Sequence, residues 1–277
     1  MLDGILAILL NPLFYRALIS VILISIVAST IGSVIVFRGM SFLVSAIAHS
    51  ALAGAALAII LDQYNIVKDI NPTLGALIFG IAMAMFIGTY GKAEIREQME
   101  IVIGISFALS MSLAVLFISI MREYSTSVWA LILGDILLLS IEDVILLAVI
   151  SIFVSFVFVL FMREFIHIAF DAEGARALGV NVRLYDMLLL ILIASSTVVL
   201  LRGVGAILIY TVLVIPPAIA NISGKHVTDV ILKAFIISIT SGILGILLSF
   251  PLHVAPSALI GIILVCLYII VATKKRR

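Results

Sequence analysis

The sequence predicts an all-α, polytopic helical membrane protein, and two observations carry that prediction. Of the 277 residues 65% are hydrophobic and only 11% are charged, and the mean hydropathy is +1.41. Apolar runs long enough for a helix to cross about 30 Å of hydrocarbon follow one another from Leu13 to Ala272. Because lipid offers the backbone no hydrogen-bond partners, such runs must be helices. We expect a single transmembrane domain over residues 1–277, with no separate soluble domain.

Run length and composition predict about nine membrane spans. They are Leu13–Phe37, Phe42–Leu61, Pro72–Tyr90, Met99–Met121, Val144–Met162, Leu184–Leu201, Val204–Asn221, Val227–Phe250 and Ala255–Thr273. The apolar segment Val128–Ser140 is too short to cross comfortably, so we expect a re-entrant or interfacial helix there.

The basic residues predict the orientation. If the tail Lys274–Arg277 is cytoplasmic, nine crossings place the N-terminus outside. The other cytoplasmic basic residues are then Arg38, Lys92, Arg96, Arg163, Arg176, Arg183 and Lys225, against Arg16, Lys68, Arg122 and Arg202 outside. This excess satisfies the positive-inside rule, so we expect a multi-pass protein of the cell membrane with a cytoplasmic C-terminus.

Several classes are disfavoured by what the sequence lacks. A formal charge of +1 gives no reason to expect a nucleic-acid partner, and the single cysteine, Cys266, excludes a disulfide framework or a cysteine-based metal site. There is no GxxxxGK[ST] phosphate loop, HExxH or G-x-S-x-G motif. We therefore expect no enzyme activity in this chain, either as a nucleotide hydrolase or as an intramembrane protease.

The second span carries small residues on one face and a histidine near its middle. Ala46, Ser50, Gly54 and Ala58 recur every four residues, which lets a neighbouring helix approach closely. His49 lies beside that face, with Ser45 one turn before it. A histidine inside a membrane is either a pathway residue and metal ligand or a hydrogen-bonded packing residue, and its type alone leaves both readings open.

The break between the fifth and sixth spans predicts a short helix outside the membrane. Asp171 is a good N-cap, Glu173 and Arg176 suit the helix dipole, and Gly179 is placed to end the helix after Ala172–Leu178. A helix this short needs something to pack against. It either docks a cytoplasmic protein or rests on lipid headgroups.

Two prolines and a second histidine complete the candidates. Pro216 and Pro217 should kink or break the seventh span, as in helices that open and close a pathway, although many transmembrane prolines are only bends. His253 lies in an outer turn, where it is either solvated or guards an entrance. Asp135, Glu142 and Asp143 cluster on the outer side, where they either attract cations or, as we expect by default, are solvated loop residues.

Four stretches resemble the membrane permease subunit of the zinc/manganese ABC importer family. They are GSVIVFRGMSFLVSAIAHSALAGAALA (Gly32–Ala58), ALILGDILLLSIEDV (Ala130–Val144), FDAEGARALGV (Phe170–Val180) and GAILIYTVLVIPPAIA (Gly205–Ala220). The resemblance implies a homodimer around a central path and two cytoplasmic ATP-binding subunits. It also implies an extracellular metal-binding lipoprotein and alternating access driven by ATP. Asp171–Gly179 would be the coupling helix, and the transported zinc or manganese would be cargo, with no covalently bound cofactor.

The sequence departs from the family pattern at two acidic positions. Many members have an aspartate four residues before the signature histidine, where this chain has Ser45, and Val254 stands where an acidic residue precedes Pro256. A hydroxyl is a poor substitute for a carboxylate around a divalent cation. A permease of the same family for a metal chelate or another small solute therefore stays open. A stand-alone secondary carrier or channel is a further alternative, and it would act without an ATPase.

Overall fold

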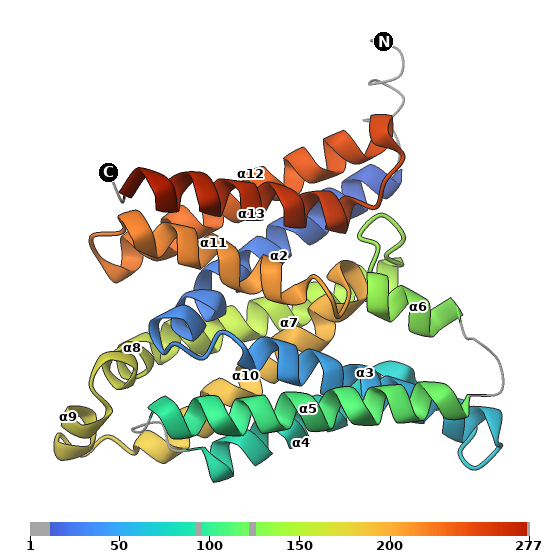
Figure 1. Cartoon of the computed structure of the whole chain (residues 1–277), viewed down its shortest axis with the longest axis horizontal. Helices are drawn as coiled ribbons and strands as arrows, with labels where there is room; N and C mark the ends of the chain where they lie inside the picture. Colours follow the sequence, from blue (N-terminus) through green and yellow to red (C-terminus); the bar gives the residue numbers. More distant parts are fainter. Residues whose placement is uncertain (1–11, 92–95, 122–125, 276–277) are drawn as a thin grey trace.

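The computed structural model describes residues 12–91, 96–121 and 126–275, and within these ranges all regular structure is helical (Figure 1). The twelve helices are α2 (Pro12–Phe37), α3 (Leu43–Gln63), α4 (Pro72–Tyr90), α5 (Arg96–Ile120), α6 (Thr126–Leu133), α7 (Ile141–Leu160), α8 (Met162–Phe170), α9 (Ala172–Ala177), α10 (Val182–Val204), α11 (Ile209–Ser223), α12 (Val227–Leu252) and α13 (Pro256–Lys275). The predicted all-α fold is confirmed. Lys92, Arg122, Arg276 and Arg277, which entered the orientation argument, lie outside the described residues.

Eight of these helices are long and apolar enough to cross a membrane, and they coincide with eight predicted spans. The exception is α11, which has 15 residues and begins at Ile209, five residues later than predicted. The cause is Gly205, whose positive φ of 86° ends α10 and leaves residues 205–208 outside both helices.

Helix α11 nevertheless connects the same two ends of the molecule as the long helices. At its start, the backbone N–H of Ala206 donates to the Leu131 carbonyl at 3.0 Å, beside α6. At its end, the Ile222 carbonyl accepts a hydrogen bond from Nζ of Lys275, the last residue of α13, at 2.8 Å. The predicted seventh span therefore passes through the molecule as a short helix with a non-helical entry.

The helices run between two ends, named here the α9 end and the α6 end (Figure 1). At the α9 end the ring of Phe37, which closes α2, lies 5.6 Å from that of Phe170, just before α9. At the α6 end Phe14, near the start of α2, lies 6.5 Å from Phe250 of α12. The described chain thus starts at the α6 end and finishes at the α9 end, as an odd number of passes requires.

Side-chain size decides which helices are central. In α2, α3 and α10, 72–78% of the span residues are buried inside the protein, against 22% in α5 and α7. Alanine-rich α3 lets neighbours approach on every side, whereas α5 and α7 expose large aliphatic and aromatic side chains. The predicted small face packs against α4, where a Cβ on Gly54 would overlap the Gly75 carbonyl.

The segment predicted as re-entrant or interfacial contains a shorter helix than expected. Helix α6 has eight residues and stops at Leu133, before Gly134 turns the chain with a positive φ of 65°. At about 1.5 Å per residue α6 is far too short to cross hydrocarbon. Gly134 lies against Gly205, and a Cβ on either glycine would overlap the backbone of the other segment.

Candidate functional site

The ring of His49 is held so that one nitrogen remains available. Its Nδ1 lies 2.9 Å from the backbone oxygen of Ser45, one turn earlier in α3. A carbonyl oxygen can only accept, so Nδ1 carries the proton. In the neutral imidazole the lone pair is then on Nε2, and a histidine oriented in this way is a common metal ligand.

The face of α3 that holds His49 is bordered by an aromatic side chain of α5. The ring of Phe107 lies 5.1 Å from the imidazole in an edge-on arrangement and 4.8 Å from the ring of Phe42. Ser45 and His49 are both half-buried. His49 lies about one third of the way along α3 from the α9 end, so it is nearer that end than the sequence suggested.

A complete coordination site is not present in one subunit among the described residues. No group of three or more histidine, cysteine, aspartate or glutamate side chains there is arranged to hold a metal ion. His49 therefore needs other ligands, such as hydroxyls, backbone oxygens, water or residues of a second copy, to hold an ion.

Pro216 and Pro217 lie inside the protein within a continuous helix. Of the kink or break predicted at these prolines, the break does not occur, because α11 runs through both. Pro217 has no N–H to donate to the Leu213 carbonyl, and that carbonyl faces Gly32 of α2, where a Cβ would overlap it. The prolines thus mark a close crossing of α2 and α11.

His253 is remote from His49. It is exposed, has a left-handed φ of 53° and follows the last residue of α12 at the α6 end. The structure therefore does not bring the two candidate histidines together.

The predicted helix outside the spans is present as α9 and is capped at both ends. The Asp171 carboxylate accepts from the Gly174 N–H at 2.8 Å, and a Cβ on Gly174 would overlap that carboxylate. Gly179 has a φ of 85°, its N–H donates to the Arg176 carbonyl at 3.0 Å, and the next N–H reaches Ala175, also at 3.0 Å. These two hydrogen bonds are the Schellman arrangement that ends helices at glycine.

Helix α9 presents a mixed surface and is anchored on one side only. Ala175 is buried with Ile168 of α8 and Val182 of α10. Glu173 and Arg176 are exposed, and the flanking Phe170 and Leu178 are 67% and 76% exposed. This capped helix with exposed charged and apolar neighbours suits a docking surface.

A buried ion pair near α9 was missed by the sequence analysis. Nη2 of Arg38, which follows the last residue of α2, lies 2.5 Å from Oδ1 of Asp186 in α10, and the side chains are only 7% and 16% exposed. Arg38 entered the sequence argument only as a basic residue between spans. The signal that could have found the pair is opposite charge at the ends of two apolar runs.

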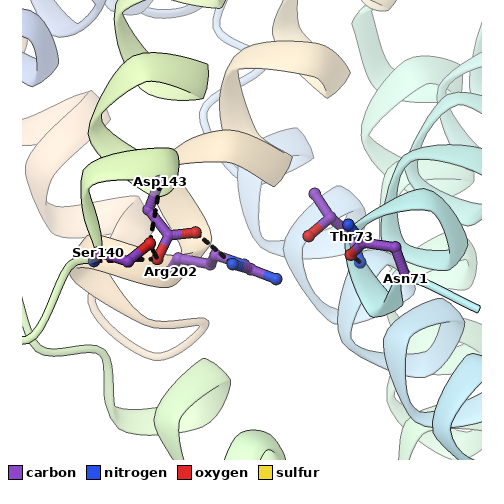
Figure 2. A network of polar contacts seen from close by, with 5 residues as sticks. All are labelled: Asn71, Thr73, Ser140, Asp143 and Arg202. Atoms are coloured by element: carbon purple, nitrogen blue, oxygen red, sulfur yellow. Dashed lines mark hydrogen bonds and ion pairs between the residues drawn. The ribbon is translucent and has the colours of Figure 1, made fainter. Parts of the chain in front are cut away.

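A second ion pair lies at the α6 end (Figure 2). Arg202, in the last turn of α10, is paired with Asp143 in the first turn of α7, and the Ser140 side chain also accepts from the Asp143 N–H at 3.1 Å. The expectation that Asp143 is a solvated loop residue is wrong, since it is 15% exposed and completes a capping box. In Figure 2 the guanidinium extends away from Asp143 toward the side where Asn71 caps α4 by accepting from the Thr73 N–H.

Comparisons with known proteins agree with this architecture over almost the whole chain. The model of the ABC 3 transport family matches residues 11–275. The manganese import system permease protein ScaB of Streptococcus parasanguinis is 31% identical over 265 residues, which are 95% of this chain and 91% of that protein. The manganese transport system membrane protein MntC of Listeria innocua is 31% identical over 92% of this chain and 88% of its own length.

A solved structure described as PsaBC from Streptococcus pneumoniae in complex with Fab has the same fold. It matches with a TM-score of 0.82 and 27% identity, covering 98% of this chain and 95% of that one. The resemblance expected from the four sequence stretches is thereby confirmed, and the chain belongs to the ABC 3 transport family.

Proposed function

We propose that this chain is the permease subunit of an ABC importer for a divalent transition metal, with Mn²⁺ as the first candidate and Zn²⁺ as the second. The observation that carries the proposal is similarity over more than nine tenths of the chain to manganese import permeases. The metal is cargo, and ATP is hydrolysed on separate ATP-binding subunits. This chain itself forms the path for the ion and changes conformation during transport.

His49 is the proposed ligand of the ion in the pathway. Its Nε2 offers the lone pair, the Ser45 carbonyl fixes the ring, and the Ser45 hydroxyl lies on the same helix face. Mn²⁺ favours oxygen-rich, six-coordinate surroundings, which one histidine and one hydroxyl do not supply. A homodimer would bring a second His49 and Ser45 to a shared path, and water would supply the remaining oxygens.

The α9 end is the proposed cytoplasmic end. Described basic residues concentrate there, including Arg163, Arg176, Arg183, Lys225 and Lys275. Two ATP-binding subunits would dock on α9, with Asp171 and Gly179 fixing its ends and Glu173 and Arg176 exposed as contacts. ATP binding and release would then drive alternating access, with α11 and its Pro216–Pro217 segment moving during gating.

The α6 end is then extracellular, with the N-terminus outside. It would receive a metal-binding lipoprotein that delivers the ion. His253 is exposed at this end and is the weaker of the two histidine candidates, since its turn is open to solvent and it belongs to no group of three or more histidine, cysteine, aspartate or glutamate side chains among the described residues.

A second candidate is a permease of the same family for a metal chelate or another small solute. The observation that favours it is Ser45, because a pathway without the family carboxylate is less suited to binding a bare divalent cation. A stand-alone carrier or channel is disfavoured by membership of an ABC family and by the capped α9.

The test is metal-stimulated ATP hydrolysis. The chain would be assembled with its ATP-binding subunits and binding protein in proteoliposomes, and Mn²⁺ and Zn²⁺ would be titrated. We expect stimulation by one ion, lost in His49→Ala, because the variant removes the only intramembrane imidazole of α3. His226→Ala is the matched control, since it removes an exposed imidazole at the N-cap of α12.

The same assay separates the two candidates. Ser45→Asp should lower the metal concentration for half-maximal stimulation, because a carboxylate is a stronger ligand for a divalent cation than a hydroxyl. An assembled complex that hydrolyses ATP but responds to neither ion would refute the metal assignment and favour a chelate or another solute.

A further inference from the structure

The Arg38–Asp186 pair is more deeply buried than stability alone would favour. Both side chains are almost withdrawn from solvent, at 7% and 16% exposure. Taking two charges out of water is unfavourable, and an apolar pair of similar size often stabilises a protein as well or better. A role in holding two particular elements together therefore accounts for the pair better than a general contribution to stability.

One partner of the pair belongs to the anchor of α9. Val182, in the first turn of α10, is buried against Ala175 of α9 and Ile168 of α8, and Tyr185 packs on the same cluster. Asp186 directly follows Tyr185 in α10. A displacement of α9 is therefore passed to the start of α10 through direct side-chain contacts.

The other partner belongs to a tight connection that leads to His49. Gly39, with a φ of 67°, donates to the Val36 carbonyl at 3.1 Å, and the N–H of the buried Met40 donates to Ile35, also at 3.1 Å. The Leu43 N–H then donates to the Met40 carbonyl at 3.0 Å, where α3 begins. Because these hydrogen bonds constrain the short connection between α2 and α3, the backbone at Arg38 is held in a fixed position relative to the first turns of α3.

A second contact joins the end of α2 to the residue that precedes the N-cap of α9 in the chain. Phe37 lies against Phe170, which directly precedes the Asp171 cap, at a ring distance of 5.6 Å. The end of α2 thus touches the residue before α9 through Phe37 and the helix after α9 through Arg38. The coupling segment is held on both flanks by two consecutive residues.

We propose that Arg38 and Asp186 are positioning residues that tie the α9 segment to the helix bearing His49, so that the two move as one unit throughout the transport cycle. The inference rests on the proposed function, in which α9 docks the ATP-binding subunits and His49 meets the ion. The pair stays closed in every state, and its task is to transmit displacement between the nucleotide side and the metal path.

The first experiment separates transmission from assembly. Arg38→Gln, Asp186→Asn and the exchanged pair Arg38→Asp/Asp186→Arg would be assembled with the ATP-binding subunits and binding protein in proteoliposomes. We expect both single variants to retain the ATP-binding subunits and basal hydrolysis but to lose stimulation by Mn²⁺ or Zn²⁺, and the exchanged pair to regain it. Asp229→Asn, which breaks the more exposed Lys233–Asp229 pair at the same end, is the matched control and should keep full stimulation.

The second experiment tests whether the tie stays closed. In a Cys266→Ser background, Arg38→Cys/Asp186→Cys would be measured before and after treatment with a short thiol cross-linker. We expect no stimulation before treatment and restored stimulation after it, in the same preparation. Because the protein is unchanged except for the cross-link, this comparison remains informative even if the single variants fold poorly.

Three results would overturn the inference. The first is full metal stimulation of ATP hydrolysis in Arg38→Gln, and the second is that neither the exchanged pair nor the cross-link restores stimulation. The third is that none of the variants assembles with the ATP-binding subunits, since the pair would then have a purely structural role. The unmodified complex distinguishes failure of the proposed function from failure of this inference alone. If it shows no metal stimulation, the proposed function fails and the inference with it, whereas stimulation that persists in Arg38→Gln refutes the inference alone.

Discussion

The two ends of α10 carry ion pairs of the same chemistry in different surroundings. At the α9 end Asp186 pairs with Arg38 at the end of α2, and at the α6 end Arg202 pairs with Asp143 at the start of α7. Each pair joins an arginine near a helix C-terminus to an aspartate near a helix N-terminus, the arrangement that helix dipoles favour. The Arg38 side chain is 7% exposed, however, and the Arg202 side chain is 34% exposed.

The neighbouring contacts differ even more. At the α6 end the α10–α11 break is also held by backbone hydrogen bonds from Ala206 to Leu131 at 3.0 Å and from Ile207 to Ile132 at 3.5 Å. The Ser257 hydroxyl adds a bond to the Gly134 carbonyl at 3.2 Å. At the α9 end, within the described part of the chain, no backbone hydrogen bond joins α2 to α10. At the α6 end the ion pair is therefore accompanied by backbone hydrogen bonds that hold the neighbouring chain segments, whereas at the α9 end the ion pair is more deeply buried.

The largest expected effect is that of Arg38→Gln. The substitution removes the charge of Arg38 from the largely buried ion pair with Asp186, which should reduce the free energy of unfolding by about 3–5 kcal/mol. Thermal unfolding of the purified protein in a mild detergent would measure it. A midpoint close to that of the unmodified protein would contradict the central role given to this pair.

The second largest effect is expected for Gly205→Ala at the α6 end, which should reduce the free energy of unfolding by about 2–4 kcal/mol. Gly205 has φ 86° and ψ 155°, a conformation that is almost exclusive to glycine, and a Cβ there would overlap the Leu133 backbone. The same unfolding measurement applies. Wild-type stability in this variant would show that the Gly134–Gly205 crossing does not hold the α6 end.

The matched substitution Arg202→Gln should reduce the free energy of unfolding by a smaller amount, about 1–2 kcal/mol. The reason is that the Arg202 guanidinium is partly exposed and that Asp143 remains hydrogen-bonded to Ser140 in the capping box. Comparing its midpoint with that of Arg38→Gln tests the contrast between the ends directly. Equal losses in the two variants would remove the distinction drawn here.

The smallest expected effect is that of Gly179→Ala, about 1 kcal/mol. Gly179 also has a positive φ, at 85°, but a Cβ there would meet nothing within 4 Å, so only the backbone conformation is penalised. We expect little change in the global unfolding midpoint and faster amide hydrogen exchange in α9. A loss as large as that of Gly205→Ala would mean that the end of α9 is more tightly packed than described.

Composition and local signals were sufficient for much of the architecture. Hydrophobic run length located the eight long spans, and the small residues of α3 predicted a close helix neighbour. Asp171 and Gly179 predicted both ends of α9, because caps depend on residues only a few positions apart. Family membership followed from motifs that are contiguous in the chain.

The candidate site was predictable only in part. His49 and Ser45 were identified from their residue types and spacing, and the spacing of four residues is what allows the imidazole to reach the Ser45 carbonyl. Pro216 and Pro217 were expected to kink or break their helix, and α11 is continuous through both. The interruption lies instead at residues 205–208, because packing against Gly32 accommodates the prolines whereas Gly205 is held in a conformation that ends α10.

By itself, the sequence determined that this chain is a helical membrane protein with a capped segment outside its spans and one histidine in a span, because each of these depends on local composition or short spacing. Only the tertiary structure decided that α3 packs on α4, that Asp143 meets Arg202, and that Arg38 joins α2 to the α9 anchor. Asp143 and Arg202 are 59 positions apart, and Arg38 and Asp186 are 148 apart. In an apolar chain many helix arrangements bury similar surface, so these partners are fixed by where small side chains let helices approach and bring opposite charges together.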